Sequence, residues 1–264
     1  LLQPPGRIDG GQALLDGVDL FSLSEERMRQ IRGAEISMIP QGSMNSLNPV
    51  MRIKNQMIDT MTAHNEDLGR DGAIRRVHEL LEMVGLNRQV ADMYPHELSG
   101  GMKQRVCMAN AIVLRPKVII ADEPTSALDV VVQKQVMDTL GKVQSDIDAS
   151  VILVGHDMGL MAQFTNRIAI MYAGRMMEIG PVEAIFDRPL HPYTRLLIST
   201  LPSLTAKGVF RVIGGLTPSL LNLPPGCAFH SRCPESSKDC ATEGPSLQEV
   251  APGHWVACYR DRGC

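Results

Sequence analysis

Several features that would each point to a particular class of protein are missing from this sequence. No apolar run approaches the roughly 20 residues that a membrane-spanning helix needs, and no secretory signal precedes the first predicted elements. The formal net charge is only −3, so there is no basic excess of the kind that nucleic-acid-binding proteins use to contact phosphates. These absences favour a soluble, cytoplasmic chain that acts at a membrane only by docking onto other subunits.

What is present is typical of a globular protein with a substantial core. The chain has 264 residues, of which 44% are hydrophobic and 21% are charged. That length allows one large domain, or one domain with an appendage. Beyond Gly208, Gly, Pro and Cys become frequent and regular periodicity fades. We therefore predict a first domain over residues 1–205 and a cysteine-rich extension over residues 206–264.

Apolar patterns predict strands that alternate with helices, which indicates an α/β layered fold. Short continuous apolar runs predict strands buried on both faces of a parallel sheet, and apolar residues at helical spacing predict amphipathic helices. Glycine-containing turns predict hairpins, and residues 1–6 read as a helix end followed by a turn. The predicted strands are Glu35–Ile39, Val118–Ala121 and Val151–Val154, the helices are Asp71–Val84 and Val132–Ile147, and the hairpins are Arg7–Leu20 and Arg167–Ile179.

The most specific chemical signal is a pair of acids directly after a predicted strand. Asp122 and Glu123 follow the run Val118–Ala121 and precede Pro124. The carboxyl edge of a parallel sheet is where α/β proteins bind ligands. An Asp there suits the coordination of Mg²⁺ beside nucleotide phosphates, and a neighbouring Glu can polarise an attacking water. Considered alone, the pair fits a solvated acidic turn equally well.

Three further motifs flank this pair. Residues 98–105, LSGGMKQR, place a hydroxyl and two glycines at the start of a helix, where N–H groups and the helix dipole attract anions. The alternative is a plain N-cap at Ser99 with glycines for the turn. Residues 126–129, SALD, follow the acids, and His156 comes after the strand Val151–Val154. Such a histidine can contact a phosphate oxygen, although a histidine by itself is more often structural.

The order of these motifs resembles that of the nucleotide-binding domains of ATP-binding-cassette (ABC) proteins. A glutamine loop, LSGGMKQR, a strand ending in two acids, SALD and a histidine follow one another from Gln41 to His156. The resemblance implies an α/β fold with a P-loop NTPase-type cassette core, a helical subdomain over about residues 47–100, and ATP hydrolysis with Mg²⁺. The cysteine-rich part would then be a small C-terminal extension.

The resemblance also implies a role for each motif residue. Gln41 would contact Mg²⁺ or the attacking water, Asp122 would hold Mg²⁺ through water, and Glu123 would be the general base. His156 would contact the γ-phosphate, and Asp129 would lie in the loop that joins the two sites of a cassette dimer. The residues expected to bind the ATP held by an opposing subunit are Ser99, Gly100, Gly101 and Gln104.

Within this family, the sequence looks like the oligopeptide/dipeptide/nickel importer branch. The expected partners are a second ABC ATPase subunit in a homo- or heterodimer, transmembrane permease subunits and, indirectly, an extracytoplasmic solute-binding protein, with no nucleic acid. The chain would be peripheral at the cytoplasmic face of the membrane, and peptides, nickel and certain glycosides are all compatible substrates. The segments that carry this resemblance are Pro5–Ile8, Leu23–Arg32, Ser46–Pro49, His191–Thr194, Gly226-Cys227, Phe229, Arg232–Pro234, Cys240, Pro245, His254 and Cys258.

The sequence departs from the family pattern in two places. The phosphate-binding motif G-x-x-x-x-G-K-[ST] is missing, since the single Gly-Lys pair, Gly141-Lys142, is followed by Val143 inside a predicted helix. We expect an amino-terminally truncated chain. The alternative is a non-catalytic subunit that completes a partner's ATP site. The glutamine loop reads Ile39–Ser43, IPQGS, where relatives usually have an aromatic residue before the glutamine and an acid-proline pair after it. A cassette acting in DNA repair or on ribosomes is disfavoured, because there is no basic patch.

Four of the six cysteines crowd into the extension. In a reducing cytosol, clustered thiols are more often metal ligands than disulfides, but the C-x2-C spacing of zinc sites is absent. Four thiolates can hold an iron–sulfur cluster, and the importer branch is associated with a four-iron–four-sulfur (4Fe-4S) cluster here. We therefore expect that cluster, with zinc or four reduced thiols as alternatives. Cys107 is expected to be a small buried apolar residue, and the candidate ligands are Cys227, Cys233, Cys240 and Cys258.

Overall fold

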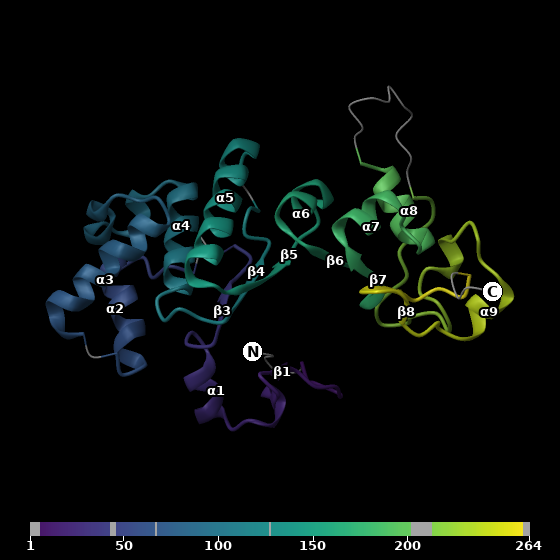
Figure 1. Ribbon diagram of the computed structural model, residues 1–264, viewed down its shortest axis with the longest axis horizontal. Coiled ribbons are helices and arrows are strands. Elements are labelled where there is room, and N and C mark those ends of the chain that lie inside the picture. The colour runs from purple at the N-terminus through teal and green to yellow at the C-terminus, as the bar shows by residue number, and fades with distance from the viewer. Residues whose placement is uncertain (1–5, 43–45, 67, 127, 202–212, 261–264) are drawn as a thin grey trace. The chain divides into compact units, whose positions relative to one another are not determined.

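The computed structural model describes residues 6–42, 46–66, 68–126, 128–201 and 213–260. The chain divides into two compact units, Leu1–Gly155 and His156–Cys264 (Figure 1). Helices and strands alternate along the first unit, which confirms the predicted α/β fold. The predictions that lie outside the described residues concern the helix end at residues 1–5, Ser43 of the glutamine loop, Ala127 of SALD, the domain boundary between residues 205 and 206, and Cys264.

A three-stranded parallel sheet forms the centre of the first unit. Its strand order is β3-β4-β5, and Met38, Ile120 and Ile152 lie side by side across it. The strands confirm the prediction from short apolar runs, and Ile119 and Ala121 are fully buried. The bounds are β3 (Ile36–Ile39), β4 (Val118–Asp122) and β5 (Ser150–Val154).

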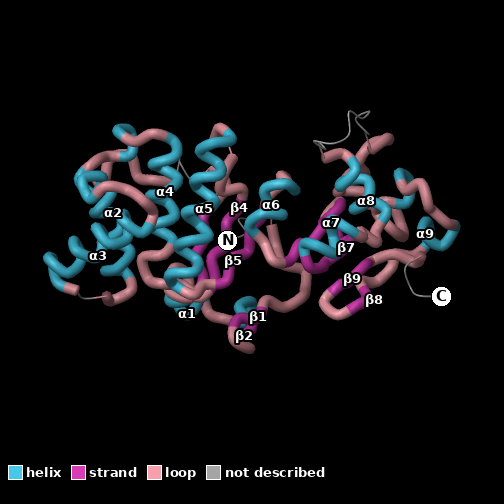
Figure 2. The backbone as a smooth tube through the Cα atoms, turned by 45° about the horizontal axis from the view of Figure 1, so that its top comes forward, coloured by secondary structure: helices cyan, strands magenta, loops and turns pink. Residues whose placement is uncertain are grey.

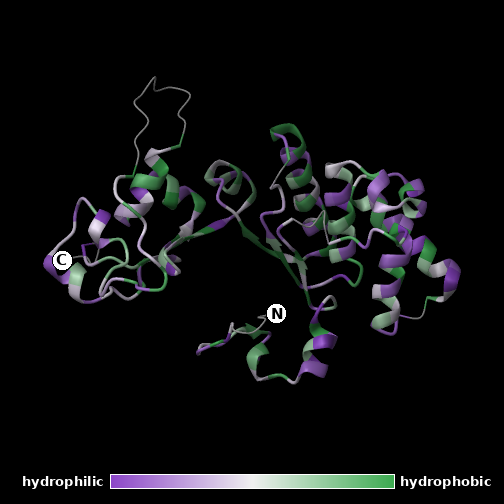
Figure 3. Ribbon diagram, turned by 180° about the vertical axis from the view of Figure 1, so that it is seen from behind, coloured by the Kyte–Doolittle hydropathy of each residue, from purple (hydrophilic) through white to green (hydrophobic). Residues whose placement is uncertain are grey.

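The two faces of this sheet differ in burial. Two helices, α4 (Gly100–Ala111) and α5 (Val130–Ile147), lie on one side of the strands (Figure 1), and α4 contacts β3 directly. On the other face, Met38, Ile152 and Val154 are 53%, 54% and 46% exposed, and the strands are coloured green in the view from behind (Figure 3). The prediction of strands buried on both faces is therefore wrong for this face, because its apolar side chains remain open to solvent.

A layer of helices follows β3 in the sequence. The α2 helix (Ile53–Ala63) packs against α3 (Gly69–Met83), which confirms the helix predicted over Asp71–Val84. Two short 3₁₀ helices, η3 (Arg88–Asp92) and η4 (Pro95–Glu97), lead on towards α4. None of the described helices is both long enough and apolar enough to cross a bilayer. The fully or almost fully buried side chains of α2 and α3 are Ile53, Met57, Met61, Val77, Leu80 and Leu81.

A short hairpin precedes the sheet in the sequence. Its two strands pair antiparallel across Asp16 and Gly17, which both have positive φ, at 49° and 81°. A two-residue type I′ turn requires this conformation at both positions. The hairpin predicted over Arg7–Leu20 is thus confirmed, although its pairing is confined to the residues nearest the turn. The elements of this region are β1 (Leu14–Leu15), β2 (Val18–Asp19), η1 (Leu20–Ser22) and α1 (Glu25–Ile31).

The second unit contains a four-stranded sheet with the order β6-β7-β9-β8, in which every pair is antiparallel. The hairpin predicted over Arg167–Ile179 is confirmed as β6 and β7. Strand β9 comes from the cysteine-rich segment and pairs with β7, with Val256 opposite Glu178. Much of the segment 213–260 is otherwise loop (Figure 2). The bounds are α6 (Met158–Phe164), β6 (Arg167–Tyr172), β7 (Arg175–Pro181), α7 (Val182–Asp187), α8 (Pro192–Ser199), η5 (His230–Arg232), α9 (Lys238–Thr242), β8 (Gln248–Ala251) and β9 (His254–Val256).

A buried carboxylate joins three elements of the second unit. Glu178 on β7 is fully buried and accepts hydrogen bonds from the backbone N–H groups of Leu190 (2.8 Å) and His191 (2.9 Å). Its Oε1 atom also lies 2.8 Å from His254 Nε2 on β9. A buried carboxylate is costly unless its oxygens have partners. These contacts therefore fix the start of α8 and the strand β9 against β7.

Candidate functional site

The carboxyl ends of β3 and β4 bring three of the predicted site residues together. Gln41 follows β3, Asp122 ends β4, and Glu123 comes next. The Gln41 Nε2 atom donates a hydrogen bond to Glu123 Oε2 at 2.8 Å, although the two residues are 82 positions apart in the sequence. One edge of the sheet thus carries an amide oxygen and two carboxylates, which are ligand types that Mg²⁺ accepts.

Glu123 has a backbone conformation that residues other than glycine rarely adopt. Its φ is 43°, in the left-handed region, which costs about 1–3 kcal/mol and persists only where the surroundings hold it. The Glu123 N–H donates to Val154 O at 2.9 Å, and the Glu123 carbonyl accepts from Ser126 N–H at 3.0 Å. The neighbouring strand and the following turn therefore hold the residue in place.

The segment Ser99–Gly101 opens α4, as the LSGGMKQR pattern predicted. Ser99 is the N-cap, and its Oγ accepts a hydrogen bond from Met102 N–H at 3.3 Å. A Cβ atom on Gly101 would lie 2.8 Å from Val132 Cγ1 on α5, so close packing of two helices already requires a glycine there. Gln104 is only 3% exposed. Ser99 is exposed, so a ligand can reach the helix start there, whereas the Gln104 side chain is buried.

Asp129 and His156 both lie at the starts of helices. Asp129 is the N-cap of α5, and its Oδ1 accepts hydrogen bonds from Val131 N–H at 3.1 Å and Val132 N–H at 3.0 Å. His156 is exposed and begins the second unit. It directly precedes Asp157, the N-cap of α6. Capping accounts for the short polar side chains at Asp129 and Asp157.

The sequence did not indicate a further residue near the acids. Gln133, in the first turns of α5, donates a hydrogen bond from Nε2 to Thr125 O at 3.2 Å. Thr125 is 8% exposed and lies two residues after Glu123. A lone glutamine on a helix carries no recognisable signal in a sequence, because only the fold reveals that it faces the preceding turn.

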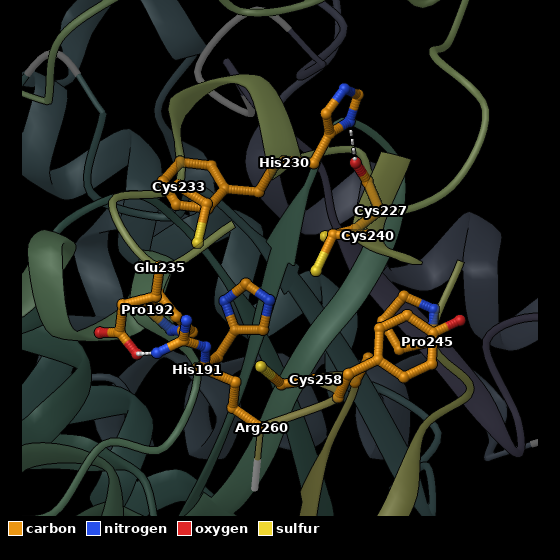
Figure 4. Close-up of a pocket in the computed structure, with 13 residues that line it drawn as sticks. His191, Pro192, Cys227, His230, Cys233, Glu235, Cys240, Pro245, Cys258 and Arg260 are labelled. Atoms are coloured by element: carbon orange, nitrogen blue, oxygen red, sulfur yellow. Dashed lines mark hydrogen bonds and ion pairs between the residues drawn. The ribbon is translucent and has the colours of Figure 1, made fainter. Parts of the chain in front are cut away.

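All four predicted metal-binding cysteines line one cavity in the second unit (Figure 4). The cavity measures about 20 Å³, which is close to the space that one water molecule needs. His191, His230 and Glu235 also contribute to its lining. Burial raises the pKa values of the Cys227 and Cys233 thiols above the ordinary value, which disfavours their thiolate forms.

The cysteine-bearing turns pack tightly in this arrangement. Cys227 N–H donates to Cys240 O at 2.8 Å, and a Cβ atom on Gly226, at φ 81°, would lie 2.4 Å from the same oxygen. Among the described residues, no three or more His, Cys, Asp or Glu side chains are grouped closely enough to hold a metal ion. The arrangement therefore gathers the four cysteines without forming a closed metal site. Cys107 on α4 is buried, as predicted.

Comparison with known proteins identifies the family. A model for the family described as "ABC transporter" matches residues 2–126, and a model for "Oligopeptide/dipeptide transporter, C-terminal region" matches residues 177–240. The chain is 41% identical over 260 residues to the oligopeptide transport ATP-binding protein OppD of Bacillus subtilis, an alignment that covers 97% of this chain and 72% of OppD. The chain belongs to the ABC transporter ATPase family.

Further similarities agree with this assignment. The ABC ATPase is 40% identical to OppD of Escherichia coli, covering 98% of the chain and 77% of OppD. It is also 40% identical to the dipeptide transport ATP-binding protein DppD of Bacillus subtilis, covering 98% and 78%. The dimeric structure of MJ0796, a bacterial ABC transporter cassette, superposes with a TM-score of 0.59 at 27% identity, over 66% of this chain and 74% of that chain. The predicted fold class and family are thus confirmed.

Membership of this family makes the chain an ATP-hydrolysing enzyme that uses ATP and Mg²⁺. The residues at the sheet edge suit the metal, since Asp122, Glu123 and Gln41 supply oxygen atoms there. The family's phosphate-binding motif, however, is missing from the 264 residues. The described residues thus contain the groups suited to Mg²⁺ and water, and lack the lysine-bearing loop that binds phosphates.

Proposed function

We propose that this ABC ATPase energises a membrane importer of peptides or related small solutes. The observation that carries the proposal is the hydrogen bond between Gln41 and Glu123 at the sheet edge next to Asp122. The names of the relatives support the transport of peptides, since the proteins at 40–41% identity are named as oligopeptide and dipeptide transport ATP-binding proteins. A purely scaffolding subunit is not favoured, because those relatives are named as ATP-binding proteins.

In this proposal, the residues at the sheet edge handle the attacking water. Asp122 would hold the Mg²⁺ that accompanies ATP, and Glu123 would act as general base by accepting the proton of the attacking water. Gln41 orients the Glu123 carboxylate by its hydrogen bond of 2.8 Å and contacts Mg²⁺ or the water. His156 contacts the γ-phosphate.

The remaining site residues act across a pair of cassettes. Ser99 and the helix start at Gly100 and Gly101 bind the ATP held by the opposing subunit, since free N–H groups and the helix dipole favour an anion there. Asp129 belongs to the loop between the two sites. Gln104 supports helix α4 from its buried position. A partner subunit supplies the phosphate loop that faces Ser99.

The same proposal defines the working assembly. Residues 1–205 form the nucleotide-binding domain, with residues 47–100 as the helical subdomain that contacts permease subunits, and residues 206–264 form the C-terminal extension. The ATPase sits peripherally at the cytoplasmic face of the membrane, paired with a second ABC ATPase and served indirectly by a solute-binding protein. Two cassettes that share nucleotide gain the differential affinity that a switch between open and closed states requires.

The substitution Glu123→Gln tests the assigned base. In the cassette assembled with its partner ATPase and permease subunits, kcat should fall at least about a hundredfold, because the amide cannot accept the proton. The ATP-bound pair should persist longer, since hydrolysis no longer reopens it. Glu183→Gln makes the same change at an exposed position of α7 and should leave kcat unaltered. A Glu123→Gln protein that turns over ATP at the wild-type rate would refute the role.

We further propose that Cys227, Cys233, Cys240 and Cys258 hold an iron–sulfur cluster. The support is that all four line one cavity, and the sulfur ligands suit iron. No group of three or more potential ligands is close enough to hold a metal ion among the described residues, so the proposal rests on the four thiols that line the same cavity.

Metal analysis of anaerobically purified protein decides this second proposal. Iron and acid-labile sulfide should be present in about equal amounts, near four per chain as in a 4Fe-4S cluster. Replacing Cys240 with Ser should lower both, whereas Cys107→Ser, at a buried cysteine in the other unit, should lower neither. One equivalent of zinc without iron, or no metal at all, would eliminate the cluster.

A further inference from the structure

The first turns of α5 carry a side chain that reaches back to the turn after Glu123. Gln133 Nε2 donates to Thr125 O at 3.2 Å, while its own N–H donates to Asp129 O at 2.8 Å. The backbone hydrogen bond places Gln133 one helical turn beyond the N-cap. From that position its amide connects α5 with the segment that links the acids to the helix.

The segment that receives this hydrogen bond holds Glu123 in an unfavourable conformation. Glu123 has φ 43°, and such a conformation persists only where the surrounding structure holds it. The backbone bonds within the turn are Ser126 N–H to Glu123 O at 3.0 Å and Leu128 N–H to Thr125 O at 3.3 Å. The Gln133 amide adds a side-chain bond from a rigid helix to the same Thr125 carbonyl.

We infer that Gln133 is a positioning residue, which acts on ATP hydrolysis through the Thr125 carbonyl and the orientation of Glu123. This inference rests on the proposed role of Glu123 as the base. Gln133 lies four residues from Asp129, next to the exposed Val130 (79%) and Val131 (67%). The exposed start of α5 is therefore connected to the backbone that carries the Glu123 carboxylate, through the hydrogen bond from Gln133 to Thr125 O.

The substitution Gln133→Glu tests the inference, because it keeps the size of the side chain and replaces the donor with an acceptor that repels the Thr125 carbonyl. In the assembled transporter, kcat should fall about tenfold, since a small displacement of a catalytic group costs one to two orders of magnitude. The KM for ATP should stay unaltered, because Gln133 touches neither nucleotide nor metal in this scheme. If this variant does not fold, Gln133→Met removes the donor without adding charge and gives the same readouts.

Gln144→Glu is the matched control at the other end of α5. Gln144 Nε2 donates to Ala149 O at 2.8 Å, so this variant also loses a side-chain to backbone hydrogen bond of the same helix. Both variants should lower the thermal midpoint, and only Gln133→Glu should lower kcat. If the two variants lower kcat in proportion to the decrease in their thermal midpoints, the positioning role is overturned. It is also overturned if Gln133→Glu leaves kcat at the wild-type value.

A double substitution separates this inference from the proposed function. If Gln133 acts through Glu123, then Gln133→Glu should cause no further loss in a protein that already carries Glu123→Gln. A further tenfold loss of kcat in that background contradicts the positioning role of Gln133 and does not bear on the proposed role of Glu123. A wild-type rate for Glu123→Gln by itself removes the base from the mechanism, independently of any result at position 133.

Discussion

At the scale of single residues, several positions serve the fold and the site together. Ser99 and Asp129 are N-caps whose side-chain oxygens accept hydrogen bonds from first-turn N–H groups. Helix caps and phosphate contacts both need a short polar side chain beside free N–H groups, so the sequence pattern could not separate the two roles. The positive φ of Glu123 is a different case, because nothing in its side-chain type predicts that conformation.

Gly101 has a packing role that mutation can test. A Cβ atom there would lie 2.8 Å from Val132 Cγ1, so Gly101→Ala should lower the free energy of unfolding by about 1–3 kcal/mol through overpacking. Val132→Ala removes the clashing methyl groups, and the double variant should therefore be more stable than the sum of the single effects predicts. Urea unfolding of the three variants measures this coupling.

Gly141→Ala provides the matched control for this prediction. Gly141 lies inside α5, and a Cβ atom there meets nothing within 4 Å. This substitution should raise the free energy of unfolding by up to about 1 kcal/mol, because alanine favours helix over glycine. Strictly additive effects of Gly101→Ala and Val132→Ala would show that packing is not what requires glycine at position 101.

At the scale of secondary-structure elements, the longer and more apolar segments were predictable. Strand β4 and helix α5 begin within two residues of their predicted starts, because continuous apolar runs and helical periodicity specify them locally. The short elements of the segment 213–260, such as α9 and β9, were not predicted. Elements of three to five residues carry too few apolar positions to show a period, and tertiary contacts hold them instead.

The start of α8 has a pH dependence that follows from burial. His191 is the N-cap of α8, and its Nδ1 accepts a hydrogen bond from Tyr193 N–H at 3.0 Å. Burial lowers the pKa of His191 from 6.5 to about 4, with nearby Arg195 acting in the same direction and Glu178 opposing it. The unfolded chain therefore binds a proton near pH 6.5 that the folded protein binds only near pH 4. This contribution to stability is complete above pH 6.5 and is lost as the pH falls towards 4, by up to about 3 kcal/mol.

The substitution His191→Asn isolates this contribution. Asparagine is a good N-cap that can accept the same N–H hydrogen bond, and it does not titrate. Urea unfolding between pH 7 and pH 4 should give a smaller loss of stability for His191→Asn than for the wild type. Equal losses for the two proteins would show that His191 does not contribute to the acid sensitivity.

At the scale of the whole molecule, each unit contains a feature that local sequence did not indicate. In the first unit, one face of the β3-β4-β5 sheet exposes Met38, Ile152 and Val154, although parallel strands are usually covered on both faces. In the second unit, β9 of the cysteine-rich segment pairs with β7, and the buried Glu178 contacts His254 across that pairing. The change in composition near residue 208 therefore does not mark the limit of the second sheet.

The sequence by itself determined the family, the α/β class, the central strands and the two acids at the end of β4. These depend on local periodicity and on motifs whose residues lie next to one another in the chain. Only the tertiary structure decided that Gln41 contacts Glu123, that Gln133 bonds to the turn between the acids and α5, and that four cysteines line one cavity. Hydrogen bonds and packing between distant segments depend on how the strands and helices assemble, and the spacing of residues along the chain does not record that assembly.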